Sequence, residues 1–438
     1  RRKNLTQLFI PICLETLLYM LSGMVDTLML SSVNDQAVGA VGTANTYIGI
    51  FIIMFSVISS GMVAVMTQNI GAGRPGVAYQ ARQLGLAFNA VLGVIMSLFL
   101  SLGAGTILSG VGVADALMQP AKTYLQIVGG FCILNALIPI CSSYLRAFGF
   151  SKEPLYASII GNVINFCLNA FFLFVLHKGV AGVATATVIS RIINLVIVVL
   201  LGAVLVKAKQ HPERESNREV MGQIIRIGLP SACETAIYNV SMTLVIRFLN
   251  QMDAQGLNVT ARSYTMQITN FSYCVGAALA QANAIMTGWH IGAKEYDACD
   301  RGTKKAAVIG VIVAVILETV FTLCSGWIMQ LFSKDPQMVS LVGKLLAIDI
   351  VLEIGRVTNL VYGQALKTSG DAVFPVVMGA CFMILCSVGG TYLFGIRLGL
   401  LAVGAYIGMA GDECVRAVGM YLRWKSGKWK QKGLVKSR

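Results

Sequence analysis

Long apolar runs recur along almost the whole chain, separated by short polar breaks. A helix of about 20 apolar residues can cross the hydrocarbon core of a bilayer, where only helices and closed barrels satisfy the backbone. Roughly twelve such runs are present, at residues 5–30, 38–67, 84–108, 121–145, 154–176, 180–206, 224–250, 261–288, 304–329, 338–364, 373–394 and 399–422. The pattern predicts an all-α, polytopic membrane protein of about twelve transmembrane helices.

The composition supports a membrane protein and argues against nucleic-acid binding. Hydrophobic residues make up 56% of the chain and charged residues only 12%, unlike an ordinary soluble domain. The formal net charge of +14 is spread over short connections and the C-terminal end, without a contiguous basic domain. We therefore expect a lipid bilayer, and no nucleic acid, around this chain.

Basic residues gather on alternate connections between the runs. These connections and the two ends hold roughly 24 of the 34 Lys and Arg residues, among them Arg74, Arg146, Lys294 and Lys367. Basic residues are retained on the cytoplasmic side of a membrane. We therefore expect both termini to lie in the cytoplasm.

The two halves of the sequence repeat each other. Pro11, Glu15 and Thr16 recur as Pro230, Glu234 and Thr235, a shift of 230 − 11 = 219, and two later matches follow at a shift of 221. Six runs in each half would bring the two copies into the membrane in the same sense. Two such bundles facing each other would leave a cleft for alternating access, although a duplicated bundle with a closed interface remains an alternative.

The longest polar connection, which contains Pro212, lies midway along the chain. We expect four parts, namely an N-terminal six-helix lobe at 1–206, a cytoplasmic linker at 207–223, a C-terminal six-helix lobe at 224–422 and a basic cytoplasmic tail at 423–438. The tail combines lysines with Trp424 and Trp429, a pattern typical of anchoring at the membrane interface.

Two carboxylates stand inside the first apolar run, Glu15 and Asp26. They are 26 − 15 = 11 residues apart, which returns to nearly the same helix face about 16 Å further along. An acid at membrane depth costs on the order of 2.5–3.5 kcal/mol on insertion scales and usually faces a cavity where ions bind. The alternative is a carboxylate hydrogen-bonded to a neighbouring helix for packing alone.

Three further oxygen-bearing side chains are expected at the depth of Asp26. Asn165 and Asn169 are four residues apart and share one helix face, and Thr187 lies on the next run. Such oxygens suit Na⁺ or a protonatable pocket. Interhelical hydrogen bonding alone is the alternative.

The second half carries its own intramembrane charges, and we take four of them as candidates for a substrate site or a second cation site: Glu234, Asp349, Glu353 and Arg356. Glu353 and Arg356 are three residues apart and are expected to pair along their helix. Glu234 has no oppositely charged neighbour in the sequence, so it is the best candidate for attracting a cation. The sequence assigns no role to Arg191, Arg247 or Glu318.

Enzyme chemistry finds little support. The three histidines are isolated, and the eleven cysteines show no metal-ligand spacing, so neither a metal centre nor an intramembrane catalytic group is indicated. The stretch from Gly71 to Gly76 fits G-x-G-x-x-G, but it follows a long apolar run rather than a strand. We interpret it as a turn between two membrane helices.

Several stretches together resemble the MATE (multidrug and toxic compound extrusion) transporters. They are Val25-Asp26-Thr27, Gln68 to Gly73, Leu145 to Gly149, Gly161-Asn162, and Gly179 to Thr187, with Asp412-Glu413 and Arg423 to Trp429 similar to a bacterial branch. The resemblance covers the whole chain. It implies two six-helix lobes, a substrate cleft and a multi-pass location in the bacterial plasma membrane.

The resemblance also implies a cation site. In archaeal-type members a proline and an aspartate of the first helix match Pro11 and Asp26, a fifth-helix asparagine matches Asn165, and a sixth-helix threonine matches Thr187. The fifth-helix aspartate of that site corresponds here to Asn169, which implies weak Na⁺ binding. An acid in an apolar bundle with few counter-charges favours its neutral form, so we expect coupling to H⁺ rather than Na⁺ through Asp26.

From these features we expect a secondary antiporter, without a cofactor, that exports small organic compounds in exchange for H⁺ or Na⁺. Its substrates would be organic cations, drugs or metabolites. A flippase for lipid-linked saccharides, from the same multidrug/oligosaccharidyl-lipid/polysaccharide exporter superfamily, is the main alternative. It would require a cleft lined with basic residues for phosphate.

Overall fold

The structure, a computed structural model, describes residues 2–435 and is helical throughout the long apolar runs. In the first half the helices are α1 (Leu5–Ser31), α2 (Asp35–Gly71), α3 (Pro75–Leu102), α4 (Ala104–Gly110), α5 (Asp115–Tyr124), η1 (Leu125–Gly129), α6 (Ile133–Ala147), α7 (Lys152–Ala170), η2 (Phe171–Val175), α8 (Gly179–Leu205) and η3 (Ala208–Gln210). In the second half they are α9 (Asn217–Met252), α10 (Leu257–Gly292), α11 (Tyr296–Leu323), α12 (Ser325–Met329), α13 (Pro336–Ser369), α14 (Val373–Phe382), η4 (Met383–Val388), η5 (Thr391–Arg397), α15 (Ala402–Lys425) and η6 (Lys428–Gln431).

These helices confirm the predicted fold class, because each of the twelve apolar runs is helical over most of its length in the described chain, either as one helix or as two or three consecutive helices. Seven helices are long and apolar enough to span a membrane, and an eighth span is formed if α5–η1 and α6, bent by 43°, are taken together. The long helices outside that set are α9, α10, α13 and α15. All four belong to the half that contains most of the buried charges.

Several helices extend beyond the apolar runs that predicted them. Helix α3 begins at Pro75, whereas its apolar run begins at residue 84. Helix α11 begins at Tyr296, whereas its apolar run begins at residue 304. The sequence reading detects only the apolar part of a helix, whereas the backbone stays helical through the polar turns at its end. For the same reason α9 already begins at Asn217, so the last residues of the expected 207–223 linker are helical.

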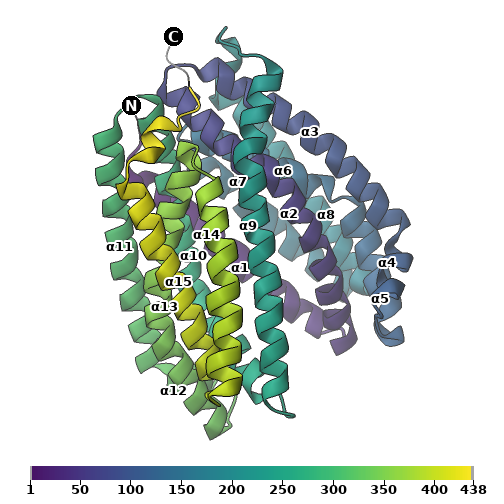
Figure 1. Ribbon diagram of the computed structural model, residues 1–438. Coiled ribbons are helices and arrows are strands. Elements are labelled where there is room, and N and C mark those ends of the chain that lie inside the picture. Colours follow the sequence, from purple (N-terminus) through teal and green to yellow (C-terminus); the bar gives the residue numbers. More distant parts are fainter. Residues whose placement is uncertain (1, 436–438) are drawn as a thin grey trace. The chain divides into compact units, whose positions relative to one another are not determined.

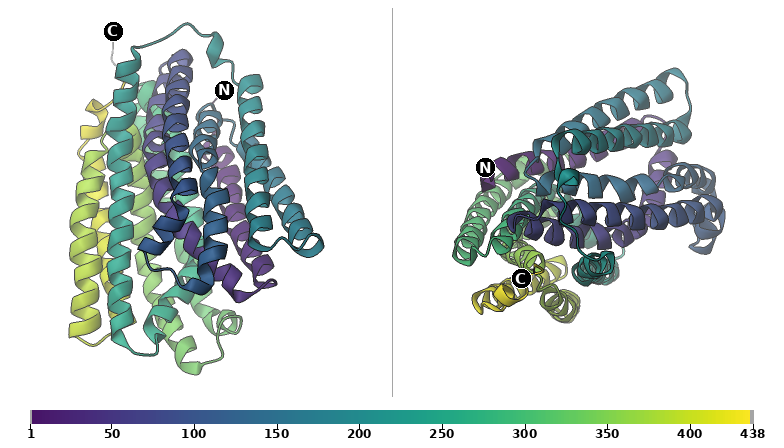
Figure 2. Two further views of the ribbon diagram at one scale, coloured as in Figure 1. Left: turned by 90° about the vertical axis from the view of Figure 1, so that its right-hand side faces the viewer. Right: turned by 90° about the horizontal axis from the view of Figure 1, so that it is seen from above.

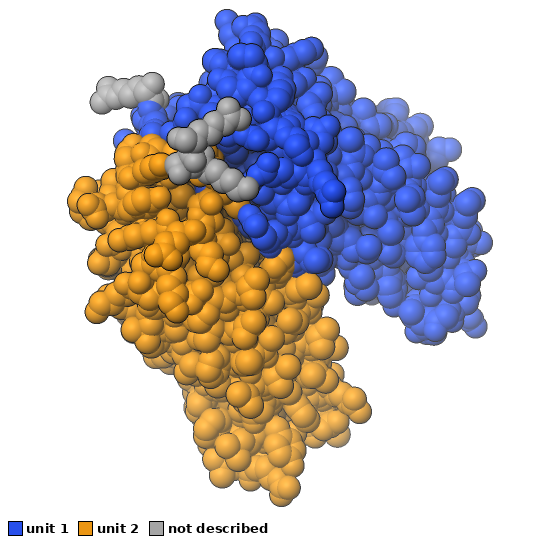
Figure 3. Space-filling view, turned by 45° about the horizontal axis from the view of Figure 1, so that its top comes forward, with its two compact units in different colours: residues 1–229 blue, residues 230–438 orange. Residues whose placement is uncertain are grey.

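The chain divides into two compact units, residues 1–229 and 230–438 (Figure 3). In the first unit α2 packs against α3, α5 and α6, while α7 packs against α1 and α8 (Figure 1, Figure 2). In the second unit α13 packs against α10, α11 and α15 (Figure 1). The division falls inside α9, a few residues from the expected boundary at 224.

The backbone repeats at the same positions as the sequence. Gly73 (φ 76°) follows α2 and Lys294 (φ 60°) follows α10, a shift of 294 − 73 = 221. Gly149 (φ 90°) follows α6 and Gly370 (φ 108°) follows α13, again at a shift of 370 − 149 = 221. Left-handed backbone is uncommon outside glycine, so its recurrence at Lys294 shows that the turn itself is duplicated. The glycine-rich stretch at 71–76 is this turn, as the sequence indicated.

The tryptophans of the C-terminal tail, Trp424 and Trp429, are packed into the second unit. Trp424 and Trp429 stack with their ring centroids 4.0 Å apart, and both are buried. The indole nitrogen of Trp424 donates to Asp300 at 2.8 Å, and Arg423 pairs with Asp371 at 2.7 Å. These two indoles therefore find their partners inside the protein, and are not available to a membrane interface as the sequence led us to expect.

Gly355 fixes the closest approach between α13 and α15. A Cβ at this position would lie 2.7 Å from the backbone nitrogen of Cys414, so only glycine fits without a shift of the helices. We predict that Gly355→Val destabilises the protein by about 1–3 kcal/mol through overpacking, measured as a lower thermal unfolding temperature of the purified protein in detergent. Gly411→Ala on α15 is the control, since a Cβ there meets nothing within 4 Å. Equal unfolding temperatures for the two variants would contradict the packing argument.

Candidate functional site

Asp26 on α1 is held by two asparagines of α7. The side-chain amide of Asn169 donates to Oδ1 of Asp26 at 2.8 Å, and that of Asn165 donates to Oδ2 at 3.5 Å. The four-residue spacing of the asparagines places both on the helix face that meets α1. The structure thus brings together three of the residues that the sequence placed in one cation site.

The carbonyl oxygens of the two asparagines complete an oxygen-rich group. Oδ1 of Asn165 and Oδ1 of Asn169 are buried and accept no hydrogen bond. A buried acceptor without a donor is destabilising unless a cation or a proton donor reaches it. Two carboxylate oxygens and two amide oxygens are ligands that a small hard cation accepts, and a protonated carboxyl group could donate to them.

The polar contacts continue along the whole α1–α7 interface. Ser22 donates to Asn162 at 3.0 Å, and Ser158 donates to Glu15 at 3.2 Å. Contact positions increase together on both helices, so α1 and α7 run in parallel. Interhelical hydrogen bonds of this kind hold membrane helices together, and here they fix the position of α7 relative to the carboxylate of Asp26.

Glu15 does not join the Asp26 group. Its carboxylate pairs with Arg146, which lies in the last turn of α6. The two acids of α1 share a helix face as expected, but about 16 Å of helix separates them and only one has a cationic partner. The position of Glu15 is therefore that of a charge paired between helices, apart from the candidate ion site.

Thr187 and Arg191 on α8 differ from expectation. The hydroxyl of Thr187 donates to the carbonyl of Val183 on its own helix at 2.9 Å, so it makes no hydrogen bond to Asp26. The guanidinium of Arg191, to which the sequence assigned no role, is close enough for its charge to interact with Asp26 and with the buried Tyr124. The third helix around this site thus contributes a positive charge, which position in the sequence alone did not reveal.

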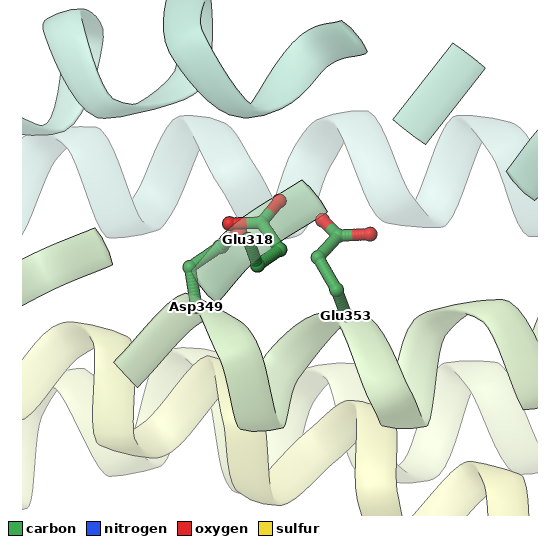
Figure 4. A group of neighbouring side chains, drawn as sticks. All are labelled: Glu318, Asp349 and Glu353. Carbon is green, nitrogen blue, oxygen red and sulfur yellow. The ribbon is translucent and has the colours of Figure 1, made fainter. Parts of the chain in front are cut away.

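The second unit contains a buried acidic cluster formed by Glu318 on α11 with Asp349 and Glu353 on α13 (Figure 4). Carboxylate oxygens of the three residues lie within 4.8 Å of one another. Both oxygens of Glu318 and one oxygen of each partner are buried without a hydrogen bond, as is the hydroxyl of Ser272 beside Glu318. Three buried negative charges this close repel one another, so the cluster is suited to protons or to a bound cation.

The buried charges where α13 meets α15 are paired. Arg356 contacts Glu353 at 2.7 Å, which confirms the pair expected from their spacing, and its Nε lies 3.9 Å from Glu413. Arg416 contacts both Glu413 and Asp412 at 2.9 Å. A network of alternating charges therefore links α13 to α15.

Glu234 also has a partner that its sequence neighbours did not reveal. Its carboxylate lies 2.6 Å from the ammonium group of Lys367 on α13. The two residues are 367 − 234 = 133 positions apart, so only the folded chain shows the pair. Glu234 is thus an acid whose charge is already balanced, rather than a free attractor for cations. Arg247, the remaining unassigned charge, is exposed.

A pocket of about 390 Å³ lies among α9, α10, α13 and α15, within the second unit. Its charged lining residues are Glu234, Arg262, Asp349, Arg356, Lys367, Glu413 and Arg416. Tyrosine and methionine side chains also line the pocket, and such side chains can adapt to bound molecules of different shape. Of the four second-unit candidates, three line this pocket, and Glu353 contacts it through Arg356.

Comparison with known proteins identifies the family. The sequence profile of the MatE family matches residues 11–171 and again residues 230–393, so that each half of the repeat is matched once. The chain belongs to the MatE family. It is therefore a membrane transporter and not an enzyme.

Curated relatives extend over the whole chain. One is YisQ of Bacillus subtilis, described as an uncharacterized transporter, which is 34% identical over 97% of this chain and 94% of its own length. Another is NorM of Thermotoga maritima, described as a probable multidrug resistance protein, which is 24% identical over 99% of this chain and 94% of its own length.

Solved structures share the fold. A crystal structure described as MATE in the straight conformation matches with a TM-score of 0.88 and 19% identity, covering 98% of this chain and 96% of the other. An outward-facing multidrug resistance MATE family transporter matches with a TM-score of 0.87 and 18% identity, covering 99% and 96%. At these identities the likeness establishes the architecture of the MatE transporter and no more.

Proposed function

We propose that this MatE transporter is a secondary antiporter that exports amphipathic, often cationic organic compounds by alternating access, driven by the inward movement of H⁺. The family membership and the relative described as a probable multidrug resistance protein support the substrate class. The observation that carries the coupling proposal is the carboxylate of Asp26 held between Asn165 and Asn169, with both amide oxygens unpaired.

The partners of Asp26 favour H⁺ over Na⁺. A Na⁺ ion entering this site must lose most of its water, and only one carboxylate offsets that cost, because both asparagines are neutral. A proton on Asp26 does not require this removal of water from a metal ion, and the protonated group can donate to one of the unpaired amide oxygens.

The acidic cluster in the second unit extends the same proposal. Glu318, Asp349 and Glu353 supply a second place where protons or a cation are held, and Asp349 also lines the pocket. A compound entering the pocket would therefore act on a carboxylate shared with the cluster. Each unit would thus contain one group that responds to the coupling ion.

The orientation forms part of the proposal. With both termini and the connection at 207–216 in the cytoplasm of a bacterial cell, most basic residues of the connections face inward. The cytoplasmic side would then hold the ion pairs of Arg74 with Glu215 and of Arg423 with Asp371. Export would run from that side outward.

The test is transport of a fluorescent organic cation in proteoliposomes, with pH and Na⁺ gradients imposed separately. We predict that a pH gradient in Na⁺-free medium drives transport by the wild-type protein. Asp26→Asn should reduce this transport at least about tenfold, because removing the charge abolishes proton binding while preserving the shape of the site. Asp35→Asn, at an exposed acid near the start of α2, is the matched control and should transport normally.

Two results would overturn the proposal. A wild-type protein that is silent with the pH gradient but active with the Na⁺ gradient would assign the site to Na⁺. Normal transport by a folded Asp26→Asn variant would show that this carboxylate has only a packing role.

Asn169→Asp tests the ion preference directly. A second carboxylate 2.8 Å from Asp26 would repel it unless a cation lies between the two, so we predict that transport by this variant gains a dependence on Na⁺. Asn162→Asp, which is 169 − 162 = 7 residues or about two turns away on the same helix, is the control and should not gain this dependence. If transport by Asn169→Asp does not depend on the Na⁺ concentration, the ion does not bind between α1 and α7.

A further inference from the structure

Arg262, near the start of α10, is a buried arginine without an acidic partner. Its side chain lines the second-unit pocket, and the residue is only 7% exposed. Among the described residues its hydrogen bonding is limited to Nη2, which donates to the sulfur of Met242 at 3.6 Å, while Nε donates to nothing. A guanidinium carries five N–H donors and is always charged, so most of its donors are directed at no protein acceptor.

The other basic side chains of the pocket are different. Lys367 is paired with Glu234, Arg356 with Glu353, and Arg416 with Glu413 and Asp412. Among the four basic residues that line the pocket, Arg262 is therefore the one that forms no ion pair with any of the described residues.

The pocket is long enough to hold a molecule of drug size with its charged group at Arg262. The guanidinium contacts Met242, which is 242 − 234 = 8 residues beyond Glu234 on α9, or about 12 Å along the helix. Tyr238 lies between these two residues on α9, and Tyr273 of α10 and Tyr406 of α15 also line the pocket. Aromatic and methionine side chains there can accommodate an apolar body while polar groups at the ends orient it.

We propose that this pocket binds amphipathic compounds that carry a carboxylate, and that Arg262 holds that carboxylate. A guanidinium and a carboxylate match each other in a bidentate pair, which would engage the donors that the protein leaves unpaired. A single unpaired guanidinium suits a monovalent carboxylate, whereas a dianionic phosphate would meet stronger repulsion from the acids that line the same pocket. The transporter would thus accept zwitterions as well as cations, an inference that rests on the proposed export of organic compounds.

The test compares two forms of one rhodamine dye, the zwitterionic free acid and its cationic methyl ester. Binding to the full-length protein in detergent is followed by fluorescence polarisation without any gradient. We predict that wild type binds the free acid more tightly than the ester. Arg262→Met should weaken binding of the acid about ten- to a hundredfold, the range of a lost charge-assisted hydrogen bond, and leave binding of the ester within about twofold.

Two further variants keep the test decisive. Arg262→Lys retains the positive charge but not the bidentate geometry, so it should lose part of the preference for the acid form of the dye. This variant replaces Arg262→Met in the test if Arg262→Met does not fold. Arg247→Met removes an exposed arginine from α9 of the same unit and should behave like wild type.

Equal affinity of the wild-type protein for acid and ester, or an Arg262→Met variant that keeps the preference, would overturn the inference. Its failure is distinguishable from failure of the proposed function. A protein that transports cations under a gradient but shows no preference for the acid refutes only the role of Arg262. A protein that shows the preference but no gradient-driven transport refutes only the antiport.

Discussion

The cost of placing charge inside a bilayer governs the arrangement of this protein. An ionised side chain at membrane depth is destabilising by several kcal/mol unless a counter-charge, a polar cavity or a bound ion compensates it. Acids of the apolar runs meet this requirement in pairs with basic residues in the last turn of a distant helix, such as Glu15 with Arg146 and Glu234 with Lys367. Because each pair stabilises both its members, it also fixes which helices are neighbours.

Three groups depart from that rule, and each departure coincides with a candidate site. Asp26 is held by neutral amides, the Glu318 cluster gathers three acids, and Arg262 has only a methionine sulfur within hydrogen-bonding distance. A buried group that the fold leaves incompletely satisfied is maintained at a cost in stability, so the compensation must come from something that enters and leaves. In a transporter of the MatE family, ions and substrates are what enter and leave. The sites proposed in the two units therefore follow from one physical argument.

The sequence predicted the fold more fully than the sites. Apolar runs give the position of each helix, and a spacing of three or four residues gives its faces, which is why the contact of Glu353 with Arg356 and the shared face of Asn165 and Asn169 could be anticipated. Such patterns are local. They cannot show that Lys367 lies against Glu234, because that contact depends on how helices more than a hundred residues apart are packed.

The same limit explains the remaining differences. The hydroxyl of Thr187 donates to its own backbone, and the charge of Arg191, one turn further along the same face of α8, is what reaches Asp26. Glu318 acquires a role only when α11 packs against α13, and the tryptophans of the tail only when the chain folds back on the second unit. The sequence alone predicts how far along a helix a residue lies and which face it occupies, whereas its contacts with other helices are known only from the three-dimensional structure.

Proton release on substrate binding tests the central claim, that Asp26 carries the coupling proton, most directly. A fluorescent organic cation is added to the purified protein in weakly buffered detergent solution near neutral pH, and a pH indicator follows the bulk solution. If the compound and the proton compete, linkage requires wild type to release protons as the compound binds. The account predicts release by the wild-type protein and a clear loss of that release in Asp26→Asn, at concentrations where the variant still binds the compound. Equal release by the two proteins, or none by wild type, would contradict it.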